Sequence, residues 1–268
     1  MDLSFLRFYN TLSQDLFESN ATQTTRYNDI HLNPNERYTF ITNYSTGYLL
    51  NGSDVLKFVD CQGNSLGVAN ATFYQLANNQ FVWELLENSF DFWEKEVRLC
   101  LNDELYTNPF VYSTYRLNET LRLDFTHKYE LDGTRYDLLD IYQSVRFKAW
   151  FSDPEFTSTM ANYTTLGGQK LSAREIKTLE CNFIADYLSN LTYLSLCHAM
   201  SCDTIYINGK RITDKPTPKK TAYNIEFNQK KVEFTGAMNF DDTYDYTEQM
   251  QLLADFDSVD FDNNDFNT

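Results

Sequence analysis

The sequence has little glycine or proline and no long apolar run. Its 268 residues include only 9 glycines and 5 prolines, which excludes collagen-like and Gly/Ser-linker chains. No stretch approaches the roughly 20 apolar residues that a helix needs to cross a bilayer. The first residues show neither a basic region nor a small-residue cleavage site. We therefore expect no signal peptide and no membrane partner.

Motifs for catalysis and metal binding are also missing. The sequence holds no GxSxG, P-loop or HExxH motif, and its five cysteines and three histidines lack zinc-ligand spacing. The nearest grouping, Cys197, His198 and Cys202, offers no fourth ligand. We therefore expect no catalytic residue, no metal and no cofactor. We interpret the cysteines as buried free thiols in a protein made in a reducing compartment.

The sequence does contain a large apolar fraction and an excess of acidic side chains. Hydrophobic residues make up 42%, which is enough for a core. The 38 acidic and 22 basic side chains give a net charge of −16, which disfavours nucleic acid, so we expect no sequence-specific nucleic-acid partner. More than half of this charge comes from residues 236–268, which hold nine acidic residues and no lysine or arginine.

A basic segment directly precedes this acidic tail. Its basic side chains are Lys210, Arg211, Lys215, Lys219, Lys220, Lys230 and Lys231. Within the segment only Asp214 and Glu226 have the opposite charge. Charged blocks are usually solvated faces or tails, but the two opposite blocks could also bind each other.

The tail ends in three Asp-Phe repeats with a period of five residues. They are Asp255-Phe256-Asp257, Asp260-Phe261-Asp262 and Asp265-Phe266. A calcium loop is rejected because Asp265 stands where that loop needs glycine. A period of five fits neither helix nor strand, but suits an extended tail with one phenylalanine anchor per repeat. We predict that the tail of one subunit docks on the basic hairpins of a neighbour; the alternative is a solvated tail.

Alternating apolar residues predict antiparallel strands through most of the first 155 residues. The pattern covers 38–42, 55–59, 97–101, 121–126 and 145–151, and period two is typical of half-buried strands. We therefore predict a mainly β protein whose first domain, 1–155, is a jelly-roll-like antiparallel sandwich with an N-terminal arm. Residues 2–18 of this arm fit a short helix or an ordered arm.

The pattern changes after residue 155. A capping box at Ser172 and Glu175, and apolar spacing near 3.6 over 183–200, predict a helix of about four turns. Asn208-Gly209 predicts a type I′ hairpin, and a second hairpin is expected around 228–230. We predict a small α+β domain over 156–236 and an extended acidic docking tail over 237–268.

Acidic and aromatic residues alternate in one stretch of the first domain. Glu84, Glu87, Asp91, Glu94 and Glu96 lie among Trp83, Phe90, Phe92 and Trp93. Aromatic platforms with paired acids could form a sugar-binding or sugar-cleaving cleft. The favoured interpretation is that the aromatic residues pack in the core while the acids face water.

Three stretches carry a resemblance to a known group of proteins. They are 56–64, 105–110 and the residues after the predicted helix, 203–209. Over most of 30–235, the chain resembles virion proteins of tailed phages of Bacteroidetes, including the crAss-like phages. The resemblance implies a non-enzymatic structural subunit in the virion, made in the host cytoplasm. It would form a homo-oligomeric ring or hub of the neck or tail, of the head-tail connector type, and would bind itself and other virion proteins. A carbohydrate-binding adhesin or adaptor at the tail tip is the alternative.

Overall fold

The structure is a computed structural model. It describes residues 4–10, 29–43, 49–75, 80–93, 95–136, 141–151, 155–159, 162–172, 176–213, 218–224 and 229–243. Within these residues the chain is mainly β, with a single α-helix, and its sheets are antiparallel except where β10 meets β2 in parallel. The predicted mainly β class is confirmed.

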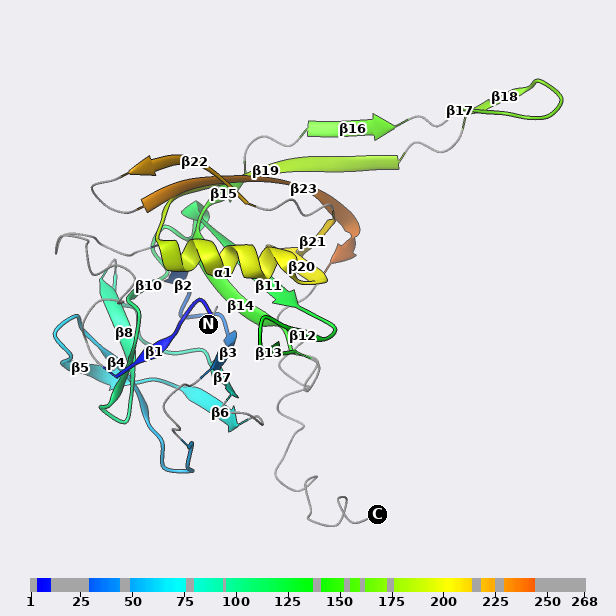
Figure 1. Ribbon diagram of the computed structural model, residues 1–268. Coiled ribbons are helices and arrows are strands. Elements are labelled where there is room, and N and C mark those ends of the chain that lie inside the picture. The colour runs from blue at the N-terminus through cyan, green and yellow to red at the C-terminus, as the bar shows by residue number, and fades with distance from the viewer. Residues whose placement is uncertain are drawn as a thin grey trace, which may run out of the picture.

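Residues before 113 build two sheets (Figure 1). A seven-stranded sheet has the order β1-β9-β8-β10-β2, with β4 on β8 and β5 on β4. Its strands are β1 (Phe8–Tyr9), β2 (His31–Leu32), β4 (Leu56–Val59), β5 (Ser65–Val68), β8 (Glu96–Leu101), β9 (Leu105–Thr107) and β10 (Phe110–Tyr112). A three-stranded sheet, β3-β7-β6, contains β3 (Tyr38–Asn43), β6 (Ala71–Gln75) and β7 (Gln80–Leu85).

A nine-stranded sheet contains most of the later strands. Its order is β14-β11-β20-β21-β23-β19-β15, with β16 on β19 and β22 on β23. Its strands are β11 (Thr120–Thr126), β14 (Gln143–Lys148), β15 (Trp150–Phe151), β16 (Glu155–Thr159), β19 (Ile176–Leu188), β20 (Thr204–Ile207), β21 (Lys210–Thr213), β22 (Lys219–Asn224) and β23 (Gln229–Thr243). β11 pairs with β20, so this sheet joins strands from both sides of the predicted boundary at residue 155. The domain boundaries themselves stay predictions.

Short elements complete the description. A 3₁₀ helix, η2 (Leu117–Glu119), precedes β11. Two separate hairpins are formed by β12 (Glu130–Leu131) with β13 (Thr134–Arg135), and by β17 (Asn162–Thr164) with β18 (Lys170–Ser172). The α-helix α1 (Asn190–Ser201) follows β19 and packs against β19 and β23.

The predicted strands are present, but the expected half-burial is wrong. β3, β4, β8, β11 and β14 lie where period two placed them. Every residue of β11 is nevertheless buried, and so is all of β14 except Lys148. Both faces of this sheet region are covered, because its polar face packs against the β2–β3 region, while Phe125 contacts the N-terminal Phe5 on the other face.

The predicted helix is only half right. Residues 176–188 form β19, whose edges are paired with β23 on one side and with β15 and β16 on the other. The helix begins after Ser189, whose side-chain oxygen accepts a hydrogen bond from the backbone N–H of Thr192. Aromatic and β-branched residues such as Phe183 and Ile184 favour the strand, and the two-sided pairing overrides the apolar spacing. The capping box predicted at Ser172 is likewise wrong, because Ser172 ends β18.

The Asn208-Gly209 prediction is confirmed. Asn208 and Gly209 have φ values of 48° and 74° and connect β20 to β21, as a type I′ turn requires. The second hairpin also forms, but its strands close between Asn224 and Gln229 rather than at 228–230. Residues 4–10 fit the ordered-arm alternative for the N-terminus, with Phe5 and Leu6 buried and β1 paired with β9.

Candidate functional site

The predicted basic segment lies on three neighbouring strands of the nine-stranded sheet. Lys210 and Arg211 lie on β21 and are half-buried, while the exposed Lys219 lies on β22. Lys220 also belongs to β22, and Lys230 and Lys231 begin β23. Lys215 lies outside the described residues.

The structure divides this basic segment into two groups along β23. Lys230 and Lys231 pair with β22 near the start of β23, whereas Arg211 pairs with Asn239. Eight residues of strand separate Lys231 from Asn239, which corresponds to about 26 Å at the rise of a β-strand. The sequence therefore suggested one basic patch, whereas the strand pairing gives two separate basic groups.

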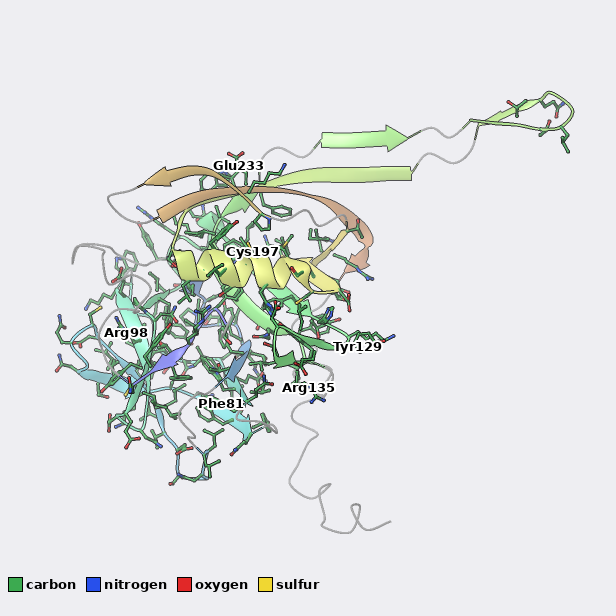
Figure 2. The ribbon with its side chains drawn as sticks, in the orientation of Figure 1. Phe81, Arg98, Tyr129, Arg135, Cys197 and Glu233 are labelled. Atoms are coloured by element: carbon green, nitrogen blue, oxygen red, sulfur yellow. The ribbon has the colours of Figure 1, made fainter. Side chains whose placement is uncertain are left out.

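Acidic residues lie close to both basic groups. Glu233 is paired with Lys219 across β22 and β23, on the side of β23 away from helix α1 (Figure 2). At the other end Thr243 is paired with Lys210, so Asp241 and Asp242 end β23 beside β21. The acidic tail thus leaves the sheet next to Lys210 of its own subunit. The tail residues predicted to dock, 255–266, lie outside the described residues.

A hairpin projects from the body of the molecule, and no sequence pattern indicated it. We use the name projecting hairpin for residues 155–159, 162–172 and 176–180. β16 and the first part of β19 pair from Glu155 with Glu180 to Thr159 with Ile176. Figure 1 shows them extending away from helix α1, with β17 and β18 at the far end. β17 and β18 form a sheet of two strands on their own.

The tip of the projecting hairpin carries an apolar side chain. Residues 165–168 turn between β17 and β18, with Gly168 at a φ of 78°. Leu166 in this turn is fully exposed and the most exposed of the large hydrophobic side chains that the structure describes. Leu166 therefore presents apolar surface to solvent at this turn.

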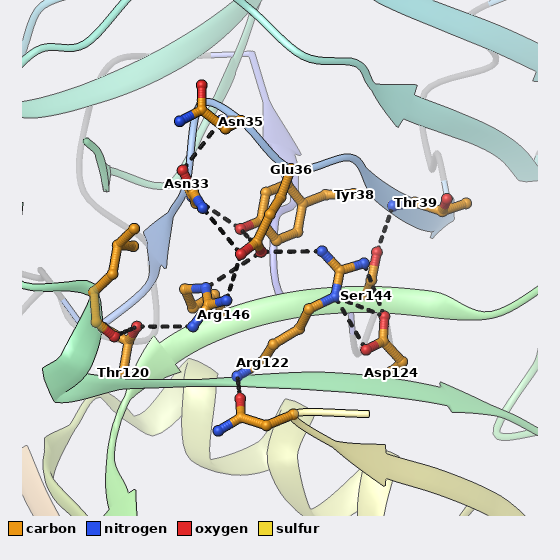
Figure 3. Close-up of polar contacts among 12 residues, drawn as sticks. Asn33, Asn35, Glu36, Tyr38, Thr39, Thr120, Arg122, Asp124, Ser144 and Arg146 are labelled. Carbon is orange, nitrogen blue, oxygen red and sulfur yellow. Dashed lines mark hydrogen bonds and ion pairs between the residues drawn. The ribbon is translucent and has the colours of Figure 1, made fainter. Parts of the chain in front are cut away.

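The most concentrated charged group is buried between the sheets (Figure 3). Glu36, in the turn before β3, accepts hydrogen bonds from Arg122 on β11 and Arg146 on β14. The Nη1 atom of Arg122 lies 3.1 Å from Glu36 Oε2, and its Nη2 atom lies 2.9 Å from Asp124 Oδ1. The Tyr38 hydroxyl donates to Glu36 Oε2 over 2.7 Å. We call Glu36, Tyr38, Arg122, Asp124 and Arg146 the ionic cluster.

Charges within the ionic cluster fix its protonation state. Burial alone would raise the pKa of Glu36, but the charge and hydrogen bonds of Arg146 and the charge of Arg122 lower it to about 2. The neighbouring carboxylates keep the pKa of the Arg122 guanidinium above its usual range, although burial opposes them. Burial also raises the pKa of Tyr38. Burial likewise raises the pKa of Asp124, against the charge and hydrogen bonds of Arg122. The cluster therefore brings two arginines together with two carboxyl groups, of which Glu36 is held ionised.

Polar contacts beside the ionic cluster show what it holds together. The edge of β3 that does not face β7 donates its backbone N–H groups to side chains of β14. Thr39 N–H donates to Ser144 Oγ over 2.8 Å, and Ile41 N–H donates to Gln143 Oε1 over 3.1 Å. Side chains thus join the three-stranded sheet to the nine-stranded sheet. Because the polar atoms of the ionic cluster bind one another in a buried position, we interpret the cluster as structural.

A second buried polar group surrounds Tyr136. Its hydroxyl lies 2.9 Å from His198 Nε2 on α1 and accepts from Gln143 Nε2 over 2.8 Å. His198 Nδ1 lies 3.1 Å from Asp132 Oδ2. An Asp-His-Tyr chain has the composition of a proton relay, but Tyr136 is buried and burial raises the pKa of its hydroxyl well above the usual value. These contacts attach α1 to the β12–β13 hairpin.

The acidic-aromatic stretch divides into a buried and an exposed part. Trp83 is buried and its indole N–H donates to Thr42 Oγ1 over 2.9 Å; Glu84 is also buried, which raises its pKa. Trp93, by contrast, is 65% exposed. The interpretation that the aromatic residues pack in the core is confirmed for Trp83 and wrong for Trp93, and the expectation that the acids face water is wrong for Glu84. Glu94 lies outside the described residues.

The cysteines also differ from expectation at one position. Cys100 and Cys202 are buried free thiols and Cys197 is half-buried, but Cys61 is exposed. Cys61 follows Asp60 in the polar turn after β4, and its thiol lies 3.8 Å from the backbone oxygen of Glu96 at the start of β8. The prediction of buried thiols is therefore wrong for Cys61.

Searches of the described residues for two kinds of site give no candidate. No group of three His, Cys, Asp or Glu side chains there has the geometry to hold a metal ion. No helix in the same residues is long and apolar enough to cross a bilayer. Comparison with known proteins finds no matching family model, no similar curated protein and no similar solved structure.

Proposed function

We propose that this protein is a non-enzymatic structural subunit of a tailed-phage virion. It would form a homo-oligomeric ring or hub in the neck or tail and would bind copies of itself and other virion proteins. We include in this proposal the finer description of the fold: a jelly-roll-like sandwich over 1–155, a small α+β domain and a docking tail.

The observation that carries the proposal is the projecting hairpin. A two-stranded hairpin alone is at best marginally stable in water, and β17 and β18 pair with each other beyond the end of the body. The exposed Leu166 adds apolar surface at the point that reaches furthest. Such an element is expected to gain its stability and its buried surface from a neighbouring subunit, as in a ring built from heterologous contacts.

The charge distribution supports the same proposal. The basic groups on β21, β22 and β23 face solvent or are half-buried where the structure describes them, and the tail carries the opposite charge. Because the tail begins beside Lys210, it can reach basic strands on its own subunit or on a neighbour. Docking between subunits would depend on protein concentration, whereas docking within a subunit would not.

The mass of the assembled protein tests the proposal. Purified full-length chain should form a discrete oligomer in light scattering, and image reconstruction of particles that contain it should place it as a repeated subunit at the neck or tail. A chain that stays monomeric at every concentration and is missing from particles would refute the assignment.

The alternative function is carbohydrate binding at the tail tip. Of the two tryptophans that suggested it, Trp83 is buried and Trp93 is exposed. Of these two residues, only Trp93 can therefore contact a sugar without unfolding of the core.

A further inference from the structure

Trp93 belongs to a small aromatic surface. Its ring stacks on Tyr115 with 4.5 Å between the ring centroids and 28° between the planes. The guanidinium of Arg116 lies 5.1 Å from the centroid of the Tyr115 ring. We call Trp93, Tyr115 and Arg116 the aromatic platform. One face of the indole rests on Tyr115, and the exposed 65% of Trp93 leaves the other face open to solvent.

One carboxylate holds the two halves of the aromatic platform together. Asp91 accepts hydrogen bonds from the backbone N–H of Trp93 over 3.0 Å and the Ser113 hydroxyl over 2.7 Å. It also accepts from the backbone N–H and hydroxyl of Thr114 over 3.2 and 2.5 Å. Burial alone would raise the pKa of Asp91, but the Thr114 and Ser113 hydrogen bonds lower it to about 2. The carboxylate is therefore ionised and accepts these bonds at neutral pH.

The backbone of the aromatic platform is held in an unusual conformation. Trp93 has a φ of 39° and Arg116 a φ of 56°, in the left-handed region that bulky residues rarely adopt. Phe92, next to Trp93, packs on Phe58 and stacks on Phe90, which anchors this turn to the body. Strained backbone at an exposed, well-anchored residue is typical of binding sites.

The chemistry of the aromatic platform favours a sugar ring. One face of a pyranose carries C–H groups with slight positive charge, which suit the negative face of an indole ring. The sugar's hydroxyl groups extend sideways, where the Arg116 guanidinium, which also pairs with Glu119, provides N–H donors. Single-stranded nucleic acid also stacks on aromatic rings, but it needs a positively charged groove, and this chain has a net charge of −16.

We propose that the aromatic platform binds the apolar face of a pyranose ring in a polysaccharide, with Trp93 as the stacking residue and Asp91 as a positioning residue. The site is complete within one subunit. It therefore does not rest on the assembly proposal, and either proposal can fail without the other.

Affinity electrophoresis of the full-length protein tests this site. Native gels would contain dextran, laminarin, xylan, galactomannan or yeast mannan. At least one polysaccharide should retard the wild-type protein. The Trp93→Ala and Tyr115→Ala variants should bind it at least tenfold more weakly, while the matched controls Trp150→Ala and Tyr129→Ala, which also remove exposed aromatic rings, should bind as wild type.

A glycine variant separates binding from folding. Trp93→Gly should lose retardation and keep or raise the melting temperature, because glycine adopts positive φ without strain. Equal retardation of wild type and Trp93→Ala would overturn the proposal. So would the lack of retardation in every gel, a lower melting temperature of Trp93→Gly with binding retained, or retardation by a thymidine oligonucleotide that Trp93→Ala abolishes.

Discussion

The body and the projecting hairpin of this molecule differ in which side chains they bury and which they expose. In the body, β11 and β14 are covered on both faces, and the charged residues Arg122, Asp124 and Arg146 are buried in the ionic cluster. In the projecting hairpin, β17 and β18 pair with each other and end in the exposed Leu166. The described part of the body buries charged side chains, whereas the described turn of the hairpin exposes an apolar one. The difference suggests that the first region provides stability and the second provides contacts with other molecules.

Removal of one charge of the ionic cluster should cause the largest loss in the free energy of unfolding. Arg122→Ala leaves Glu36 and Asp124 buried without their shared partner, and removal of one member of a buried pair costs about 3–5 kcal/mol in the free energy of unfolding. Urea denaturation measures this loss. Lys57→Ala breaks the solvent-exposed pair with Asp103 and should cost less than about 1 kcal/mol. Similar losses for the two variants would contradict the role given to the cluster.

Acid should weaken the body through Glu36. Its pKa of about 2 lies below the ordinary glutamate value of 4.5, so its stabilising contribution is complete above about pH 4.5 and is lost as the pH falls to about 2. The shift corresponds to about 3 kcal/mol. Unfolding free energies of wild type and Glu36→Gln should therefore converge in that range. A constant difference down to pH 2 would show that Glu36 is not held as predicted.

The opposite test changes the projecting hairpin and leaves the body intact. Leu166→Asp should weaken self-association at least tenfold, because burial of a leucine side chain is worth about 1.5–3 kcal/mol. Its melting temperature should match that of wild type. Leu49→Asp replaces another exposed leucine, on the body, and serves as the control in sedimentation velocity experiments. Equal effects of both substitutions would remove the special role of the tip.

The smallest effect is expected from the acidic tail. Truncation after Thr243 keeps β23 complete and removes residues 244–268. Self-association should weaken several-fold at low salt and should match that of wild type at about 1 M salt, where the Debye length is only about 3 Å. Light scattering at two salt concentrations measures the change. Unchanged association at low salt would mean that the tail is a solvated segment.

Sequence patterns predicted the positions of the strands and turns better than they predicted the burial and long-range pairing of these elements. Period two found β3, β4, β8, β11 and β14, and Asn208-Gly209 found its turn, because strand alternation and positive φ are local properties. The burial of Arg122 and Arg146 could not be predicted, since it depends on Glu36, which is 86 and 110 residues away. β19 was mistaken for helix because its pairing with β23 is also a long-range property.

The candidate surfaces were foreseen to a smaller extent. The charge blocks in the sequence identified the basic residues, but they did not predict that these residues form two groups along β23. The projecting hairpin gave no signal, because Thr157–Gly168 reads as a polar loop in the sequence. Trp93 was assigned to the core with Trp83, since an alternating pattern does not distinguish an aromatic residue inside a strand from one in a turn.

The central claim is that the projecting hairpin connects copies of this chain, and one deletion tests it most directly. Thr159 and Ile176 are paired, so an Asn-Gly turn can replace residues 160–175 and close β16 onto β19. Native mass spectrometry would then compare the shortened and full-length proteins. We predict a discrete oligomer for the full-length chain and a folded monomer, with a similar melting temperature, for the shortened one. An oligomer of the same subunit number after the deletion would contradict the claim.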